Sequence, residues 1–417
     1  MRRFLLFAQI VAVAPLAAEL GAQATPVTVG VEGKASQSVT AAAAGQFVAL
    51  AFTASDASGA DVFVAVSRDG GATFAAPVRV NATPGDSRAG GEQPARVALI
   101  TKPRGLPDIA VVWTTKGAAG TRLLTARSTD GGRTFGAPSG IPGGDAAGNR
   151  GWESVTVDKT GRLFTMWLDH RETVKAKEQM QTMEGMTHDP TAQAQLSKLY
   201  VSALGDDAPR VVTAGVCYCC KTSLVTGGDG ALYGVWRHVY AGSQRDIALT
   251  VSRDGGRTFA APVRVSEDHW HFDGCPDNGP ALAVDRVNHV HVAWPTPPDG
   301  KTGTPLALFY ATSTDGRTFT PRVRIPTKGP AHHVQMTPMP DGSLLLAWDE
   351  LTSSGRKVHV ARATPGEGGT ATFAELPVAE QGSGTYPAVA TTANGAVIAW
   401  TRTEASGSTI AVQRIER

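Results

Sequence analysis

The stretch SRDGGRTF at residues 252–259 decides the fold, because closely similar stretches occur three more times along the chain. These copies are SRDGGATF at 67–74, STDGGRTF at 128–135 and, with one glycine fewer, STDGRTF at 313–319. Two of the four copies continue identically as AAPVRV, at 75–80 and 260–265. Self-similarity of this kind indicates an array of supersecondary units, each of which buries its apolar face against its neighbours.

Each copy predicts a tight turn between two strands. The aspartate at the third position can accept hydrogen bonds from backbone N–H groups of its own turn, and the glycines allow the positive φ that closes it. The four aspartates are Asp69, Asp130, Asp254 and Asp315. The motif resembles the Asp-box, or BNR repeat, of the sialidase-like β-propellers, where it links the last two strands of a blade. The resemblance implies that these aspartates stabilise turns and carry no chemistry.

A second repeated feature is an alternating apolar strand that ends on an aromatic residue, the pattern of a half-buried strand. It occurs at Val48–Phe52, Ile109–Trp113, Leu163–Trp167, Leu232–Trp236, Val290–Trp294, Leu344–Trp348 and Ala396–Trp400. Seven such strands predict an all-β propeller of seven four-stranded blades. A ring of six blades, which is typical of the resembled family, is the alternative.

The two ends of the repeat array are complementary. The last repeat stops after Thr409–Ile415, one strand short of a full blade, and a spare strand pattern at Pro26–Val31 precedes the first full repeat. We expect these segments to pair and complete the seventh blade, because closure removes exposed sheet edges. The propeller is then one domain over residues 25–417.

The first 24 residues have the features of an export signal. Arg2 and Arg3 precede a mostly apolar run over residues 4–18, and Ala22-Gln23-Ala24 is a cleavage pattern. We expect cleavage after Ala24 and a periplasmic or extracellular protein, with a retained N-terminal anchor as the alternative. No later stretch is apolar enough for a transmembrane span.

The charges are balanced, with 39 Lys and Arg residues against 37 Asp and Glu residues, and no stretch is strongly basic. This argues against nucleic acid as a partner. Protein partners are not predicted.

Propeller topology gathers loops from different blades on one face. With strands named a to d from the central channel outward, the d-to-a connections and the b-to-c turns lie on the same face, here called the entry face. Seven of the ten histidines and all four cysteines fall in or near these loops. We therefore expect the functional site on the entry face, where a metal, another small ligand or a glycan would bind.

The cysteines open two neighbouring repeats: Cys217, Cys219 and Cys220 open the fourth and Cys275 the fifth. With His332 and His333 they predict a metal site, and their soft thiolates select copper(I) or zinc. Copper is favoured, since C-x-C-C is not a standard zinc spacing. Disulfides are the alternative, because an even number of cysteines is typical of exported proteins. A bond from Cys275 to any of the other three would join the fourth and fifth blades.

An insertion in the third repeat favours the prediction that the bound metal is copper. It contains Met180, Met183 and Met186, followed by His188, and as a b-to-c connection it would fold over the entry face. Thioethers with a histidine are suitable copper ligands. A short amphipathic helix that packs its methionines on the propeller is the alternative.

The resemblance to sialidases implies a second kind of site. A sialidase uses an arginine triad, a Tyr–Glu nucleophile pair and an Asp acid/base. The matching candidates on the entry face are Tyr386 as nucleophile, Glu153 as its base, Asp277 as acid, and Arg171 and Arg237 as the anion-binding residues. Two carboxylates flanking a sugar are the usual glycosidase arrangement. Each candidate can equally serve as a polar residue that stabilises a loop.

One motif of the family is misplaced in this chain. The first sialidase arginine lies in an F/Y-R-I-P motif near the N-terminus, whereas the only R-I-P here is Arg324-Ile325-Pro326, at the end of the fifth repeat. Because a convincing arginine triad is missing, a propeller that binds a metal or another ligand at its Cys/His-rich site is the first hypothesis. An exo-sialidase-like glycoside hydrolase acting on extracellular glycans is the alternative. Whether the chain is an enzyme at all, either a glycoside hydrolase or a metal-dependent enzyme, stays open.

Overall fold

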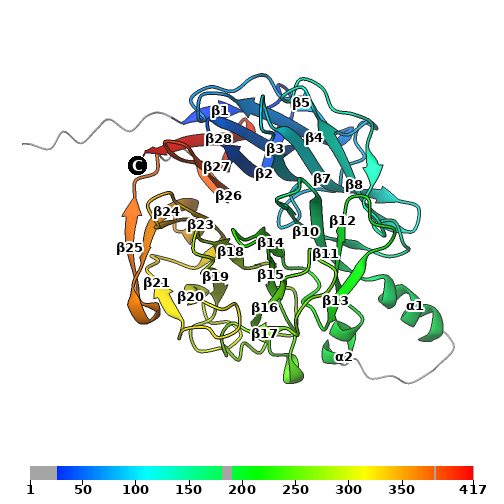
Figure 1. Cartoon of the computed structure of the whole chain (residues 1–417), viewed down its shortest axis with the longest axis vertical. Helices are drawn as coiled ribbons and strands as arrows, with labels where there is room; N and C mark the ends of the chain where they lie inside the picture. Colours follow the sequence, from blue (N-terminus) through cyan, green and yellow to red (C-terminus); the bar gives the residue numbers. More distant parts are fainter. Residues whose placement is uncertain (1–25, 181–189, 380–381, 417) are drawn as a thin grey trace, which may run out of the picture.

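The protein is a ring of seven β-sheets in a computed structural model that describes residues 26–180, 190–379 and 382–416 (Figure 1). Each sheet has four strands, and every pair of neighbouring strands is antiparallel. The prediction of seven four-stranded blades is confirmed, and the six-bladed alternative is wrong. Within the described part of the chain, no helix is long and apolar enough to cross a membrane.

The blades follow one another in sequence, and their first strands surround the central channel. The first blade is β2 (Ala35–Ala44), β3 (Phe47–Asp56), β4 (Gly59–Ser67) and β5 (Val78–Arg79). The second is β6 (Arg96–Ile100), β7 (Asp108–Gly117), β8 (Gly120–Ser128) and β9 (Ser139–Gly140). The third is β10 (Arg150–Val157), β11 (Leu163–Asp169), β12 (Lys198–Ala203) and β13 (Arg210–Ala214). The next two are β14 (Ser223–Thr226), β15 (Leu232–Arg237), β16 (Ile247–Ser252) and β17 (Val263–Arg264), then β18 (Ala281–Val284), β19 (Val290–Thr296), β20 (Ala307–Ser313) and β21 (Val323–Ile325). The sixth is β22 (Ala331–Pro338), β23 (Leu344–Thr352), β24 (Gly355–Pro365) and β25 (Ala371–Leu376), and the seventh is β26 (Ser383–Thr392), β27 (Gly395–Glu404), β28 (Gly407–Glu416) and β1 (Val27–Val29). The helices α1 (Arg171–Met180) and α2 (Pro190–Gln195) lie in the connection between β11 and β12, at the outer edge of the ring (Figure 1).

The N-terminal strand closes the ring as the sequence predicts. Strand β1 pairs with β28 in antiparallel register, with Val27 opposite Val412 and Val29 opposite Ile410 (Figure 1). Val29 is buried in the core between the first and seventh blades. The seventh sheet therefore contains strands from both ends of the described chain.

Seven apolar clusters hold neighbouring blades together, one at each interface. Each cluster contains the aromatic residue that ends the repeated apolar pattern in the second strand of a blade. Residues of the preceding blade complete the cluster. For example, Trp294 of β19 packs with residues of β15 and β16, and Trp113 of β7 packs with residues of β3 and β4. Both indole rings are fully buried. The aromatic anchors are thus the wedges between blades.

The Asp-box turns lie on the face opposite the entry face. In the first blade, the N–H of Gly70 donates to the carbonyl of Gln46, which lies in the β2–β3 turn. The carboxylate of Asp69 accepts from the backbone N–H of Thr73 at 2.9 Å and from the Ser67 hydroxyl at 2.7 Å. Burial opposes ionisation, but these hydrogen bonds outweigh it and lower the pKa of Asp69 to about 2.

The second glycine of the box brings the turn against the preceding blade. Gly71 has a φ of 91°, and a Cβ there would lie 2.5 Å from Cγ1 of Val397 in β27. A side chain at this position would therefore push two blades apart. The shortened box of the fifth blade keeps one such glycine, Gly316, with a φ of 68°.

Removal of residues 25–32 tests the closure of the ring. The deletion exposes the edge of β28 and opens the core around Val29, so we expect Tm to fall by about 5–10 °C and solubility to decrease. The matched control is Thr28→Ala, which changes an exposed side chain of the same strand and should leave Tm nearly unchanged. Equal melting temperatures for the deletion variant and the control, measured by differential scanning calorimetry, would show that β1 does not stabilise the ring.

Candidate functional site

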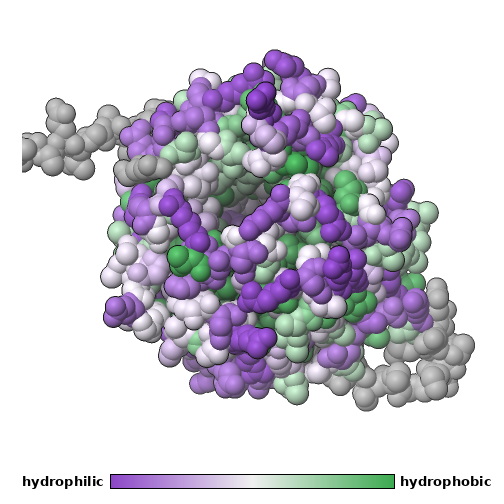
Figure 2. All heavy atoms as spheres, viewed as in Figure 1, coloured by the Kyte–Doolittle hydropathy of each residue, from purple (hydrophilic) through white to green (hydrophobic). Residues whose placement is uncertain are grey.

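A cavity of ≈ 240 Å³ lies at the central channel and is lined by residues from the first strands of most blades and the connections before them. Figure 2 shows the corresponding hollow near the centre of the ring. The polar side chains of the wall are those of Ser38, Glu92, Arg96, Lys221, His333 and Tyr386, among others. The wall therefore combines cationic, anionic and aromatic groups.

Four first strands carry a β-bulge near their beginning. The bulges occur in β2, β10, β22 and β26. At each one a non-glycine residue has a positive φ: Ser38 (58°), Trp152 (53°), His333 (53°) and Tyr386 (49°). Positive φ is costly for residues with a Cβ and is concentrated at functional sites, where it re-aims a side chain. The repeated bulge is what turns these four side chains relative to their strands.

Glu92 joins three blades at the channel. It lies in the connection before β6, and its Oε2 accepts hydrogen bonds from the backbone N–H groups of Lys221 and Gly279, both at 3.0 Å. Its side chain is almost fully buried. Lys221 continues the connection, because its Nζ donates to the carbonyl of Val334 at 2.7 Å. Burial lowers the pKa of Lys221 to about 8, although the negative charge of Glu92 opposes this shift.

Asp349 organises a second group on the wall. It is fully buried at the end of β23, and its Oδ2 lies 2.6 Å from Nδ1 of His333 and accepts from the backbone N–H of Tyr386 at 3.1 Å. Its other oxygen accepts from Arg356 at 2.6 Å. The rings of His333 and Tyr386 are in contact, with centroids 4.1 Å apart. Asp349 thus fixes the histidine ring and the tyrosine backbone together.

Tyr386 and Asp277 have shifted acidities. Burial, together with the carboxylates of Asp277 and Glu92, raises the pKa of Tyr386 to about 12. Asp277 has a φ of 48°, and although the residue is exposed overall, partial burial of its carboxyl and the nearby Glu92 charge raise its pKa to about 6. The two predicted catalytic residues therefore do lie near each other. The high pKa keeps the tyrosine phenol protonated, which suits a hydrogen-bond donor better than a nucleophile.

Glu153 does not pair with Tyr386. Glu153 is a fully buried residue of β10, and neither of its carboxyl oxygens has a hydrogen-bond partner among the described residues. Burial raises the pKa of Glu153 to about 7, while the charge of Arg96 opposes the shift. Arg96 donates from Nε to the backbone carbonyl of Glu153 at 2.7 Å. Glu153 is therefore a buried neighbour of the cavity-lining Arg96.

The two predicted anion-binding arginines are occupied by the protein itself. Arg171 binds both oxygens of Asp169 at 2.9 and 2.7 Å, and its guanidinium stacks over Tyr200. Arg237 is fully buried and donates to the carbonyls of Asn278, Arg245 and Pro295. Neither arginine lines the central cavity. Their charges support loops and strand ends instead.

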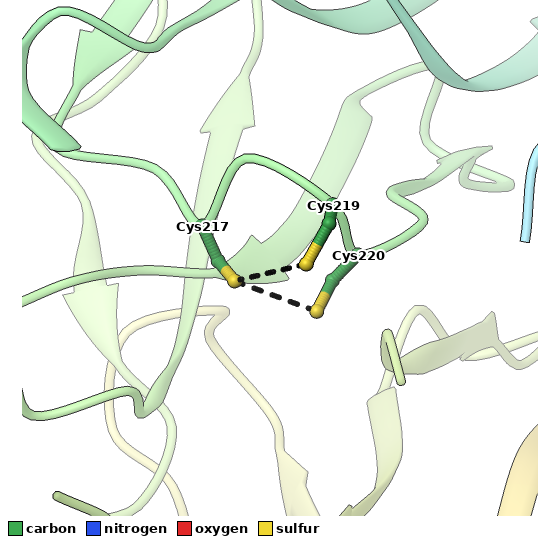
Figure 3. A group of neighbouring side chains, drawn as sticks. All are labelled: Cys217, Cys219 and Cys220. Atoms are coloured by element: carbon green, nitrogen blue, oxygen red, sulfur yellow. Dashed lines mark hydrogen bonds between the residues drawn. The ribbon is translucent and has the colours of Figure 1, made fainter. Parts of the chain in front are cut away.

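The cysteines gather beside the cavity, as their positions in neighbouring repeats predict. Cys219 forms a disulfide with Cys275, which joins the entries of the fourth and fifth blades. Cys217 and Cys220 are free and buried, with their sulfur atoms 3.5 Å apart, and the sulfur of Cys217 lies 4.0 Å from that of Cys219. Figure 3 shows the three side chains of this loop directed toward one another. Two of the six predicted metal ligands are therefore joined in a disulfide.

Two buried arginines surround Cys217. Arg245 donates from Nη1 to the Cys217 sulfur at 3.0 Å, and the charge of Arg237 is also nearby. Burial disfavours the thiolate, but the hydrogen bond from Cys220 and the two arginines outweigh it and lower the pKa of Cys217 to about 6. The pKa of Cys220 is correspondingly raised, through burial and the neighbouring Cys217 charge. Cys217 is thus the thiol of the pair that loses its proton first, and Cys220 keeps its own.

The predicted histidine ligands do not join the sulfur cluster. Among the described residues, the group whose ligand atoms lie mutually close consists of Cys217, Cys219 and Cys220 alone. His332 contacts the Asn278 amide at 3.0 Å, and Nδ1 of His333 faces Asp349. Met183, Met186 and His188 lie outside the described residues.

Three charged residues of the cavity wall are not among the residues predicted from the sequence. Glu92, Arg96 and Lys221 all line the cavity, whereas the predicted site residues were cysteines and histidines suited to a metal and residues matched to a sialidase. The available signal was position, since Glu92 and Lys221 both lie in connections that precede a first strand. Their cross-channel contacts depend on the ring geometry and are invisible in a local pattern.

No protein-family model and no curated protein sequence matches this chain. Solved structures, however, match almost all of it. A polysaccharide lyase, Uly1, has 11% identity and a TM-score of 0.53, with 94% of this chain and 98% of the lyase covered. An α-L-arabinanase from Penicillium chrysogenum has 12% identity and a TM-score of 0.51, covering 94% and 98% of the two chains. A mutant of NanB sialidase from Streptococcus pneumoniae has 11% identity and a TM-score of 0.50, covering 94% of each.

This chain has a sialidase-like propeller fold. At identities this low the likeness extends to the fold alone. The site of this sialidase-like propeller must therefore be interpreted from its own residues.

Asp349→Ala tests whether the buried carboxylate holds the cavity wall together. The substitution leaves His333, Arg356 and the Tyr386 N–H without their acceptor, so we expect a loss of about 3–5 kcal/mol in the free energy of unfolding. The control on the same blade is Glu375→Ala, which removes a half-exposed ion pair with Lys328 and should cost less than about 1 kcal/mol. Urea denaturation curves that give the two variants equal stability would contradict the assigned role of Asp349.

Proposed function

We propose that this propeller binds a glycan in its central cavity and acts on it by acid–base catalysis. The observation that carries the proposal is the Asp349–His333–Tyr386 group on the cavity wall. A carboxylate on Nδ1 orients an imidazole and leaves Nε2 to exchange a proton with a ligand. Three proteins with a similar fold are a polysaccharide lyase, an arabinanase and a sialidase, and these support a carbohydrate ligand.

The roles follow from the acidities of the groups. Asp277, with a pKa raised to about 6, holds a proton in mildly acidic solution and serves as the general acid. His333 serves as the base because Asp349 orients its ring through Nδ1, and Tyr386 donates a hydrogen bond to a sugar oxygen. Arg96 and Lys221 supply positive charge at the wall, which favours a glycan that carries carboxylate or sulfate groups.

Tyr386→Phe and a pH profile test these roles. With a panel of 4-nitrophenyl glycosides and acidic polysaccharides, we expect Tyr386→Phe to lower kcat by about 100-fold with little loss of stability. Tyr240→Phe is the matched control, because Tyr240 packs against Arg264 outside the cavity.

The wild-type rate should fall as the pH rises above about 6, where Asp277 loses its proton, and Asp277→Asn should remove that dependence. A wild-type protein that neither binds nor converts any member of the panel would refute the glycan proposal.

A second candidate function is soft-metal binding by Cys217 and Cys220. Their sulfur atoms lie 3.5 Å apart, a separation that a small shift would widen to hold one copper(I) ion between two thiolates. Such a complex carries a net negative charge, and the buried guanidinium of Arg245 is placed to compensate it. Zinc fits less well, since it takes four ligands and the Cys219–Cys275 disulfide withholds two of the sulfurs.

Copper(I) loading under anaerobic conditions tests the second candidate. We expect about one equivalent of copper to remain bound to the wild type after gel filtration, and less than about a tenth of that to remain with Cys217→Ser or Cys220→Ser. His332→Ala is the control and should keep its copper. If Cys217→Ser binds as much copper as the wild type, the ion is not held by this pair.

We further propose that the chain works outside the cytoplasm, as the export signal predicts. The Cys219–Cys275 disulfide supports this proposal, because such bonds persist in oxidising compartments.

A further inference from the structure

The four cysteines lie together, three of them buried and one exposed. Cys275 is exposed and is bonded to buried Cys219. The Cys219 sulfur lies 4.0 Å from the sulfur of Cys217, which in turn lies 3.5 Å from that of Cys220 (Figure 3). A disulfide with one exposed cysteine is thus in contact with a buried dithiol.

Thiol–disulfide exchange needs a nucleophilic sulfur near the bond, a leaving sulfur, and a further thiol that resolves the first product. Cys217 fits the first role because Arg245 donates a hydrogen bond directly to its sulfur, and a neighbouring cation favours thiolate chemistry. Cys275 fits the second role because solvent can protonate it as it leaves. Cys220, whose sulfur lies 3.5 Å from that of Cys217, fits the third.

We propose that the four cysteines form a thiol–disulfide exchange site in which Cys217 opens the Cys219–Cys275 bond from inside. Cys217 gives its proton to water and its sulfur attacks the Cys219 sulfur; a Cys217–Cys219 bond forms, the Cys219–Cys275 bond breaks, and Cys275 leaves as a thiolate that takes a proton back from water. The Cys220 sulfur then attacks Cys217 and forms a Cys217–Cys220 bond, while the proton of Cys220 passes to the departing Cys219 sulfur, which becomes a thiol. One disulfide and two thiols are present before and after, so the migration needs no external oxidant or reductant.

The migration would release the surface segment that carries Cys275. This segment leads directly into Asp277 and Asn278, and the Asn278 side chain accepts a hydrogen bond from the His333 N–H at 3.2 Å. The freed Cys275 is also the sulfur that a small external thiol or disulfide reaches first. The exchange is a property of the metal-free protein and holds independently of the glycan proposal.

Trapping of free Cys275 tests the exchange. The full-length protein, purified without reductant and kept with EDTA and excess N-ethylmaleimide, is sampled over time, quenched in acid and mapped by mass spectrometry without reduction. We expect maleimide on Cys275 to accumulate together with an internal bond, either Cys217–Cys219 or Cys217–Cys220. In Cys217→Ser, labelling of Cys275 should be about tenfold slower or slower still.

Cys220→Ser is the matched variant, because it keeps the nucleophile and removes only the resolving thiol. It should still release Cys275 and should accumulate the Cys217–Cys219 bond, which gives a result even if Cys217→Ser fails to fold. The proposal is overturned if maleimide reaches only Cys217 and Cys220 in the wild type while Cys275 stays bonded to Cys219. Equal labelling of Cys275 in the wild type and in folded Cys217→Ser would overturn it as well.

Discussion

The packing of one aromatic wedge between each pair of neighbouring blades is the constraint on which the molecule depends. Every blade presents a large side chain from its second strand to the blade before it, and the seven resulting clusters close on themselves. An open row of such sheets would leave an unpartnered apolar face at each end, so closure is what satisfies the last interface. The rigid ring then holds its first strands at fixed positions around the channel.

That rigidity explains how residues of four first strands keep positive φ values, which a flexible chain would not retain. Ser38, Trp152, His333 and Tyr386 each keep a positive φ at a bulge, and each costs free energy relative to a regular strand. The ladders beyond the bulges and the aromatic wedges beside them supply the compensating stabilisation. Buried hydrogen bonds add to it, such as those that Asp349 accepts from His333 and Tyr386. The result is a wall in which side chains from different blades meet at set distances.

The sequence was informative where structure is local and less so where it depends on the ring. The aromatic strands, the Asp-box turns and the pairing of the N-terminal strand with β28 follow from short patterns, and the structure confirms the seven blades built from them. The gathering of the cysteines also follows from topology, whereas the choice of Cys219 as partner of Cys275 depends on distances between two blades. Arg237 was selected for its place near the entry face, but three backbone carbonyls reach it only in the folded ring. Glu92 lies in a predicted entry-face loop but was not predicted as a site residue for the same reason, since both of its N–H donors come from other blades.

The pairing of β1 with β28 has a consequence for the order of folding. Strand β1 is the first described strand to leave the ribosome, yet its partner is the last, so it waits without a ladder while six blades assemble. The contact that joins Val27 to Val412 has the greatest sequence separation among the described strand pairs, and such contacts form slowly because a long loop must close first. Until then the seventh blade lacks its outer strand and the apolar face of the first blade has no neighbour. A vectorially synthesised ring of this kind passes through a nearly complete, open intermediate with exposed edges, which is the stage at which a chaperone would bind or neighbouring chains would associate.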